Sequence, residues 1–259
     1  MPLIGPTGQP GGGRTGSRRG ALPQPGGAAT IPGMDVAPGD PVGSVGAEAL
    51  ARTRTSVHGL AEHVLAVAAR AGTRSIRLRT VDGALSTPEL PGIPTGLELR
   101  PDGTVVRHPG DHVVPFAGAL GDLARALGVG FGLVDPPYPP ASGCGPEHVV
   151  DADPAALALV LGAWRTGDEA LRRFDPEQSP VVWPEHLDVA IVRDAVNYGV
   201  SPGDGFEPWP YAYVGPHAPR AGAFWNAPFG AARRLAELDG VDGVLAFFAQ
   251  GRAEAAEAV

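Results

Sequence analysis

Residues 181–192, VVWPEHLDVAIV, alternate apolar and polar side chains toward their C-terminal end. Successive side chains of a strand point to opposite faces, so Leu187, Val189 and Ile191 fall on one face. His186 and Asp188 fall on the other face. We predict a half-buried strand whose apolar face packs on helices and whose second face carries His186 and Asp188 together.

The rest of the chain places this strand in a fold class. The strand-like runs 180–193, 195–200 and 210–215 follow one another with no helical pattern between them, which favours antiparallel pairing. Apolar spacing predicts helices over 46–71, 116–129, 153–174 and 241–257, and hairpins over 74–87 and 95–108. We expect an α+β fold, mainly an antiparallel sheet with helices packed on one face. We expect one domain over 46–259, with 180–231 as its motif-bearing part and no visible internal repeat.

Composition excludes several functional classes. All 20 basic residues are arginine, so Schiff-base catalysis, pyridoxal phosphate enzymes and P-loop NTPases are excluded because each needs a lysine. A net charge of -8 argues against nucleic acid or an anionic membrane as partner. No apolar run is long enough to predict a transmembrane helix. The single cysteine, Cys144, allows no internal disulfide and fits a reducing, cytoplasmic location.

The N-terminal segment differs from the rest. Residues 1–45 are rich in glycine and proline and poor in large apolar residues, so we expect them to be disordered. SRRGAL at 17–22 resembles part of a twin-arginine signal, but no apolar segment follows it, so we expect no export. Met34 is an alternative translation start.

Residues 199–203, GVSPG, match the G-x-S-x-G pattern of hydrolase nucleophile elbows. The oxyanion hole of that fold uses the N–H of the residue after the nucleophile, and Pro202 has none. Loss of such a donor costs about 3–4 kcal/mol of transition-state stabilisation. Helix breakers also follow where the elbow requires a helix. We therefore predict that Ser201 lies in a tight turn and is not a nucleophile.

The polar face of the C-terminal strands is the best candidate for a site. Three of the four tryptophans and three of the four tyrosines fall within 183–225, and ligand pockets are typically aromatic with a few polar groups. We predict that a small molecule binds on this face and on the loops at its edge. The expected ligand-binding residues are Trp183, Asn197, Tyr211, Tyr213, Arg220, Trp225 and Asn226.

Other interpretations of the same residues stay open. His186 and Asp188 form a general-base pair in an enzyme, or join His217 as the ligands of a metal; no particular cofactor is indicated. Alternatively, the segment is a structural or interaction module without a ligand. On the first predicted helix, His58 and Glu62 share a face, and we expect them and His63 at surface or capping positions.

Four segments, WPEHLDVAI, VNYGVSPGD, PYAYVGP and FWNAPFGA, resemble a family of uncharacterised actinobacterial proteins. More distantly, the chain is similar to a wider bacterial domain of unknown function with W-P-x-H-F-D and G-x-S-P-G-D motifs. The resemblance is densest over 180–231, although Leu187 stands where that family usually has phenylalanine and His217 where it often has an aromatic residue. It implies that 180–231 acts as a unit, and it implies no catalytic role.

Overall fold

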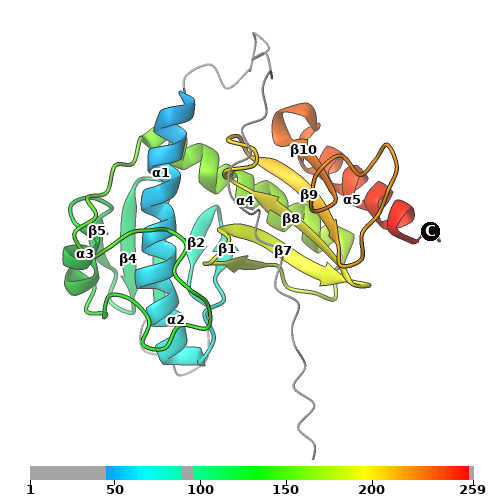
Figure 1. Ribbon diagram of the computed structural model, residues 1–259. Helices are drawn as coiled ribbons and strands as arrows, with labels where there is room; N and C mark the ends of the chain where they lie inside the picture. Colours follow the sequence, from blue (N-terminus) through cyan, green and yellow to red (C-terminus); the bar gives the residue numbers. More distant parts are fainter. Residues whose placement is uncertain (1–44, 89–95, 257–259) are drawn as a thin grey trace, which may run out of the picture.

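The computed structural model describes residues 45–88 and 96–256, which form helices and two antiparallel sheets of five strands each (Figure 1). The predicted α+β class is confirmed, although the strands divide between two sheets instead of forming one. The expected disorder of residues 1–45 and the alternative start at Met34 concern a segment that, except for Val45, lies outside the described residues.

The first half of the chain is a long helix followed by a meander. The helix comprises α1 (Ala47–Leu60), a π-helical segment η1 (Ala61–Leu65) and α2 (Ala66–Thr73), and it ends where Arg74 takes a left-handed φ of 60°. The first sheet has the order β1 (Arg79–Val81), β2 (Ala84–Ser86), β3 (Gly96–Leu99), β4 (Thr104–His108) and β5 (His112–Pro115), and α3 (Leu120–Ala126) follows it. Both predicted hairpins are present, whereas β5 was not predicted.

The second half repeats this order of elements. It comprises α4 (Pro154–Phe174), β6 (Val181–Trp183), β7 (Asp188–Arg193), β8 (Val196–Ser201), β9 (Tyr211–Pro216), β10 (Ala231–Arg234), a short 3-10 helix η2 (Leu235–Glu237) and α5 (Gly240–Ala256). The carboxylate of Asp153 accepts a hydrogen bond from the N–H of Ala156 at 2.9 Å and caps α4, whose first residue is Pro154. Each half is therefore a long helix, a five-stranded meander and a second helix, although the sequence shows no repeat.

The strand predicted over 180–193 is in fact two strands joined by a turn. Residues 184–187 form this turn, and Leu187 has a left-handed φ of 56°. His186 consequently lies in the turn and not on a strand, so the predicted alternation between His186 and Asp188 is wrong. The fixed backbone of Pro184 and the left-handed Leu187 both interrupt the extended chain.

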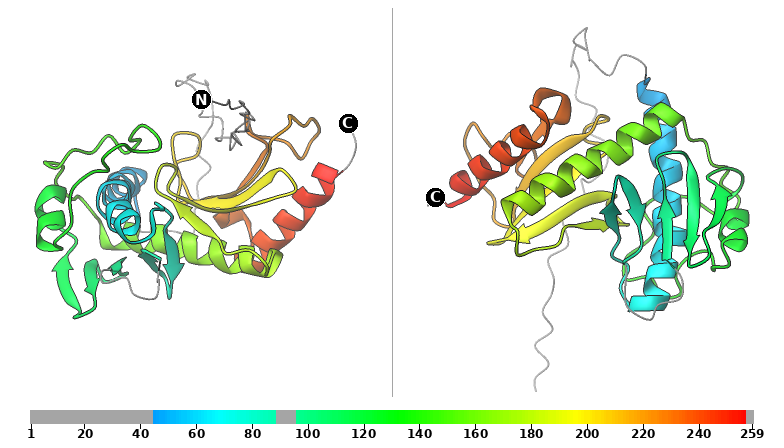
Figure 2. Two further views of the ribbon diagram at one scale, coloured as in Figure 1. Left: turned by 90° about the horizontal axis from the view of Figure 1, so that it is seen from below. Right: turned by 180° about the vertical axis from the view of Figure 1, so that it is seen from behind.

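Helices α4 and α5 cover one face of the second sheet (Figure 2). Trp164 of α4 is fully buried there, and its indole Nε1–H donates to the Leu187 carbonyl at 3.0 Å. Helix α4 also packs against α1 and against β1 and β2 of the first sheet. The two sheets meet where Leu78 and Val182 exchange backbone hydrogen bonds of 3.0 and 2.9 Å. One apolar core therefore runs through both halves.

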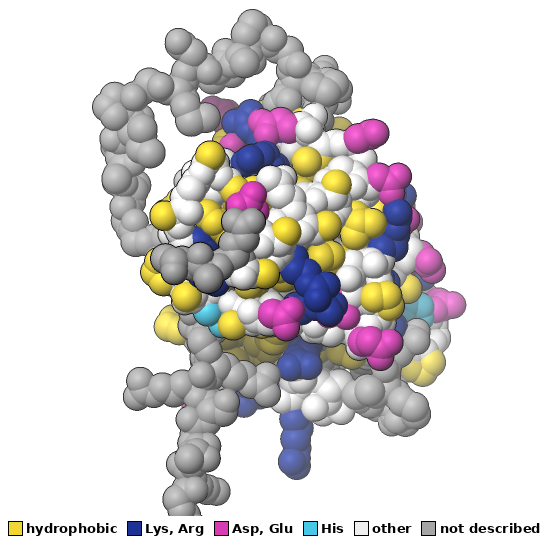
Figure 3. All heavy atoms as spheres, turned by 90° about the vertical axis from the view of Figure 1, so that its right-hand side faces the viewer, with side chains coloured by type: hydrophobic (Ala, Val, Ile, Leu, Met, Phe, Trp, Pro, Cys, Tyr) yellow, Lys and Arg dark blue, Asp and Glu magenta, His cyan; other side chains and the backbone are white. Residues whose placement is uncertain are grey.

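The surface over α5 and β10 mixes acidic, basic and apolar side chains (Figure 3). One exposed ion pair joins α5 to α4, with a guanidinium nitrogen of Arg173 2.7 Å from a carboxylate oxygen of Asp242. Within the described ranges, no helix is both long and apolar enough to span a bilayer.

Candidate functional site

Four of the predicted site residues lie near one another on the sheet face opposite the helices. Trp183 pairs with Asp188 across β6 and β7, while Tyr211 and Tyr213 lie on β9 with ring centroids 6.3 Å apart. The guanidinium of Arg77 lies 5.5 Å from the centre of the Trp183 ring. The shared strand parity of Asp188 and the two tyrosines agrees with the prediction.

The other predicted residues lie elsewhere. Asn197 shares this face but lies at the opposite end of the strands, where its Oδ1 is 3.5 Å from Nε2 of His217. Arg220 donates to the carbonyl of Ala255 on α5 at 2.7 Å, and Trp225 packs on the main core. Asn226 exchanges two hydrogen bonds with the backbone of Ala232 and so covers the edge of β10. The nine residues therefore do not converge on one cavity.

The proposed third metal ligand is also displaced, because His217 lies beside Asn197 at the other end of the strands from Asp188. In the part of the chain that the structure describes, no three histidine, cysteine, aspartate or glutamate side chains are grouped to hold a metal ion.

Asp188 and Tyr213 form a buried pair. The Tyr213 hydroxyl donates to Oδ2 of Asp188, whose other oxygen, Oδ1, is buried without a partner. Burial raises the pKa of Asp188, which is only 4% exposed, and the Tyr213 hydrogen bond lowers it by a smaller amount. Gly199 makes the pair possible: a Cβ there would lie 2.6 Å from Cζ and Oη of Tyr213, so the ring needs a residue without a side chain beneath it.

Ser201 is the last residue of β8, where it pairs with Tyr211, so it is not itself in a turn as the sequence predicts; the chain bends directly after it, at Pro202. The Ser201 hydroxyl accepts a hydrogen bond from the N–H of Gly203 at 3.1 Å, and Gly203 has a φ of 102°. The carboxylate of Asp204 accepts from the backbone of Phe206 at 2.8 Å and from the Tyr211 hydroxyl at 2.7 Å. These bonds explain Ser201 as a structural residue.

The turn between β6 and β7 brings Glu185 and His186 close to the first helix. The Pro184 carbonyl and the side chains of Glu62 and His186 all influence the pKa of His58, which burial lowers. Electrostatic interactions also link Glu185 to His186, Asp188 and Glu62. Glu62 is 2% exposed and His63 is 7% exposed, so the predicted surface or capping position is wrong for both residues.

Glu62 and His63 are buried because the loop after α3 folds across them. Oε1 and Oε2 of Glu62 accept hydrogen bonds from the N–H groups of Ala141 at 2.8 Å and Ser142 at 3.0 Å. His63 is only 7% exposed, and its Nε2 lies 3.4 Å from Oε2 of Glu62. Its ring stacks on that of Phe131, with the ring centroids 4.9 Å apart. Both residues lie in η1, and π-helical turns are frequent at functional sites.

Unpartnered polar atoms gather at this junction. Among the described residues, six buried side-chain polar atoms have no hydrogen-bond partner, and four of them belong to His58 (Nε2), Tyr138 (hydroxyl), Glu185 (Oε2) and Asp188 (Oδ1). Such atoms are rare in folded proteins, and each needs an explanation. The polar cluster is defined here by His58, Glu62, Tyr138, Glu185, His186 and Asp188.

Burial perturbs the acid–base behaviour of the polar cluster. It raises the pKa of Glu185, and the negative charges of Asp188 and Glu62 raise it further, whereas His186 lowers it. The pKa of Tyr138 is raised by burial first and then by Glu185 and Glu62. Burial therefore favours the neutral forms of Glu185, Asp188 and His58.

A cavity of about 260 Å³ borders the polar cluster at Tyr138 and Glu62. Its remaining wall is mostly apolar and includes Phe131, Leu133 and Cys144. Burial raises the pKa of the Cys144 thiol, which favours its neutral form. The cavity gives small molecules an apolar space next to buried polar atoms, a common composition for ligand sites.

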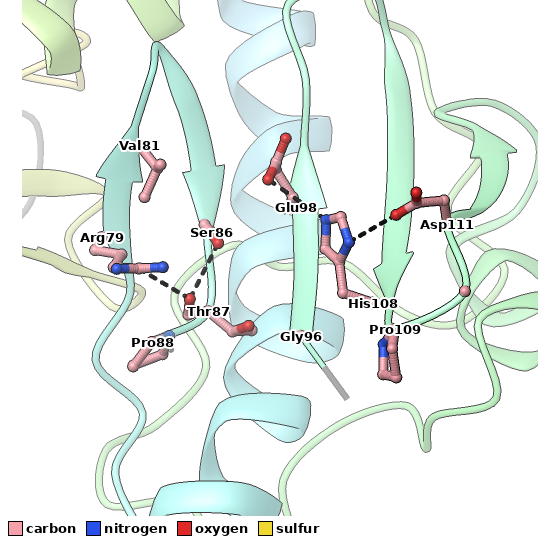
Figure 4. A pocket seen from close by; sticks show the side chains of 11 residues that line it. Arg79, Val81, Ser86, Thr87, Pro88, Gly96, Glu98, His108, Pro109 and Asp111 are labelled. Atoms are coloured by element: carbon pink, nitrogen blue, oxygen red, sulfur yellow. Dashed lines mark hydrogen bonds and ion pairs between the residues drawn. The ribbon is translucent and has the colours of Figure 1, made fainter. Parts of the chain in front are cut away.

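A second hollow of about 600 Å³ lies on the outer face of the first sheet (Figure 4). His108 lies between two carboxylates there, 2.9 Å from Asp111 and 3.7 Å from Glu98. On the opposite wall, Arg79 donates to the Thr87 carbonyl at 3.2 Å. The charged groups of this hollow have partners in its own wall, and none of the six unpartnered atoms belongs to its lining, so the polar cluster is the stronger candidate.

Sequence reasoning missed Tyr138 and Glu185 and misjudged Glu62. The spacing of His58 and Glu62 was the one available signal, but their burial depends on a loop contact 79 residues away in the chain. Comparison of the chain with protein-family models, curated proteins and solved structures finds no match, so the assignment depends on the geometry of the site.

Proposed function

We propose that this protein binds a small molecule at the polar cluster, with the neighbouring cavity holding its apolar part. The observation that carries the proposal is that four unpartnered buried atoms belong to residues connected through electrostatic interactions with Glu62, Glu185 and His186. A buried polar group without a hydrogen bond costs about 1–3 kcal/mol, so a ligand that satisfies several of them gains that free energy on binding.

The shape and composition of the neighbouring cavity also support binding. Its volume of about 260 Å³ lies just below the roughly 300–1,000 Å³ range of ordinary ligand pockets, which suits a small metabolite. Its apolar residues and its shared residues Tyr138 and Glu62 would hold one end of a ligand beside the unpartnered atoms.

A second candidate function is acid–base catalysis at the same place. The observation that favours it is the opposed perturbation of neighbouring groups: burial raises the pKa of Glu185 and Asp188 and lowers that of His58. Groups tuned in this way typically serve as general acids and bases. Loss of a bound ligand with time, accompanied by a new product in mass spectra, would distinguish catalysis from binding.

The test is a thermal-shift screen of a chemically diverse metabolite library, followed by calorimetry on each compound that raises Tm. Tyr138→Phe and Glu185→Gln each remove one polar feature of the cluster, so we expect at least about tenfold weaker binding in both. The matched controls are Tyr198→Phe, in the helix-covered core, and exposed Glu177→Gln. The proposal fails if no compound binds, or if every compound binds Tyr138→Phe and Glu185→Gln as tightly as the parent protein.

A further inference from the structure

We propose that the ligand is a small primary amine whose ammonium group is held between Glu185 and Asp188. This inference rests on the proposed function, because it names the chemical class that the same site takes. It follows from the charges of the polar cluster and from the atoms that are left without partners.

The polar cluster is rich in carboxyl groups and poor in cations. Glu62, Glu185 and Asp188 all belong to it, and the chain contains no lysine. Within the described residues, the principal electrostatic influences on Glu185 and Asp188 are histidine, tyrosine and other carboxyl groups, and no arginine is among them. Among these influences only His186 can carry a positive charge, whereas buried carboxylates are normally paired with a cation, so an ammonium ion would supply a second cation for the carboxyl groups.

The unpartnered atoms match an ammonium group in number and kind. An ammonium group has three N–H donors and no acceptor. Oε2 of Glu185, Oδ1 of Asp188 and the hydroxyl oxygen of Tyr138 are three acceptors without partners. Asp188 is also almost completely buried, so a cation at Oδ1 would be shielded from water and its interaction with the carboxylate would be strong.

The apolar cavity defines the rest of the ligand. Phe131 and Leu133 in its wall suit an alkyl or aryl group attached to the nitrogen, while Tyr138 lies at the border with the polar cluster. A short amine with one apolar substituent would therefore satisfy both regions at once.

Binding of a cation should also release protons. In the ligand-free protein, burial raises the pKa of both carboxyls, which favours their protonated forms. A cation favours the ionised forms instead, so affinity for an amine should increase as pH rises through the folded-state pKa of these groups.

The experiment is isothermal calorimetry of the full chain with benzylamine, benzyl alcohol and benzoate, three probes that share one ring and differ in charge. Each is titrated at about pH 5 and about pH 8, because the higher pH favours the ionised carboxyls, in buffers of different ionisation enthalpy. We expect benzylamine to bind most tightly, with proton release and higher affinity at the higher pH. Glu185→Gln should weaken its binding by about tenfold or more, while exposed Glu177→Gln should not.

Other outcomes separate this inference from the proposed function. If benzyl alcohol or benzoate binds more tightly than benzylamine, or if only neutral or anionic library compounds bind, and this binding is sensitive to Tyr138→Phe, the amine is wrong and the site remains. Benzylamine binding that is unchanged in Glu185→Gln also overturns the amine. If no compound of any charge binds, both proposals are wrong. Asp188→Asn serves as a second variant, and circular dichroism verifies that each variant is folded.

Discussion

Replacing Gly199 with alanine should break the buried pair of Tyr213 and Asp188. The new Cβ would lie 2.6 Å from Cζ and Oη of Tyr213, about 1 Å closer than ordinary carbon contacts allow. Tyr213 is 5% exposed and cannot move freely into solvent, so its ring must shift within the packed face. Overpacking costs about 1–3 kcal/mol, and an unpartnered buried Asp188 costs about 1–3 kcal/mol more. We therefore expect Gly199→Ala to lower the free energy of unfolding by about 2–6 kcal/mol.

Urea denaturation followed by circular dichroism measures this change, and a double variant identifies its cause. In a Tyr213→Leu background the obstructing ring is gone, so Gly199→Ala should add little, and the coupling free energy should approach the full cost of the single variant, about 2–6 kcal/mol. Gly162→Ala on α4 is the control, since no heavy atom lies within 4 Å of its new Cβ, and it should be neutral or slightly stabilising.

The pH dependence of the same variant provides a further test. The Tyr213 hydrogen bond favours the ionised form of Asp188, whose pKa burial raises above its unfolded value. A carboxyl group with a raised folded-state pKa supports the fold at low pH and loses that support as pH rises through this value. Without Tyr213 the folded-state pKa rises further, so Gly199→Ala should cost more at pH 8 than at pH 4. Additive single variants, or a change within about 0.5 kcal/mol at both pH values, would refute this reasoning.

Three other predictions concern the surroundings of the polar cluster. Because burial raises the pKa of Glu185, Glu185→Gln should be more stable than the parent at pH 8 and about equally stable at pH 4, as measured by urea denaturation. Glu62→Ala removes the acceptor of two loop N–H groups, so it should lower the free energy of unfolding by about 1–3 kcal/mol and speed hydrogen exchange at Ser142. Unchanged exchange at Ser142 would contradict the role of these hydrogen bonds in holding the loop. Trp164→Phe leaves the Leu187 carbonyl without its donor and a gap in the core, at about 1–3 kcal/mol by chemical denaturation, whereas a neutral effect would show that the turn does not need this bond.

Patterns among residues close together in the sequence predicted most of the helices and strands. The capped start of α4, the hairpins of the first sheet and the shared face of Tyr211 and Tyr213 all follow from residues close together in sequence. Strands β5 and β10 are short and lie next to loops, so their alternation was too brief to detect. His186 was misplaced because two strands joined by a short turn produce nearly the same apolar pattern as one long strand.

The candidate site was only partly predictable, for a different reason. Asp188 was found from its alternation with apolar neighbours, but the other members of the cluster come from α1, η1, the loop after α3 and the turn before β7. The burial of Glu62 depends on N–H groups 79 and 80 residues away, and no local pattern reveals such contacts. Asn226 and Arg220 were predicted to bind a ligand, but their side chains instead donate hydrogen bonds to backbone carbonyls of β10 and α5.

The repeated order of elements brings corresponding elements of the two halves into contact. The corresponding first helices α1 and α4 touch one another, and the corresponding first strands are joined beside Leu78 and Val182. Contacts of like with like characterise the isologous interface of a symmetric dimer. The chain thus consists of two halves with the same order of elements, joined through the 129–152 connection, and the polar cluster takes residues from both. A molecule bound at the polar cluster would therefore contact both halves at once.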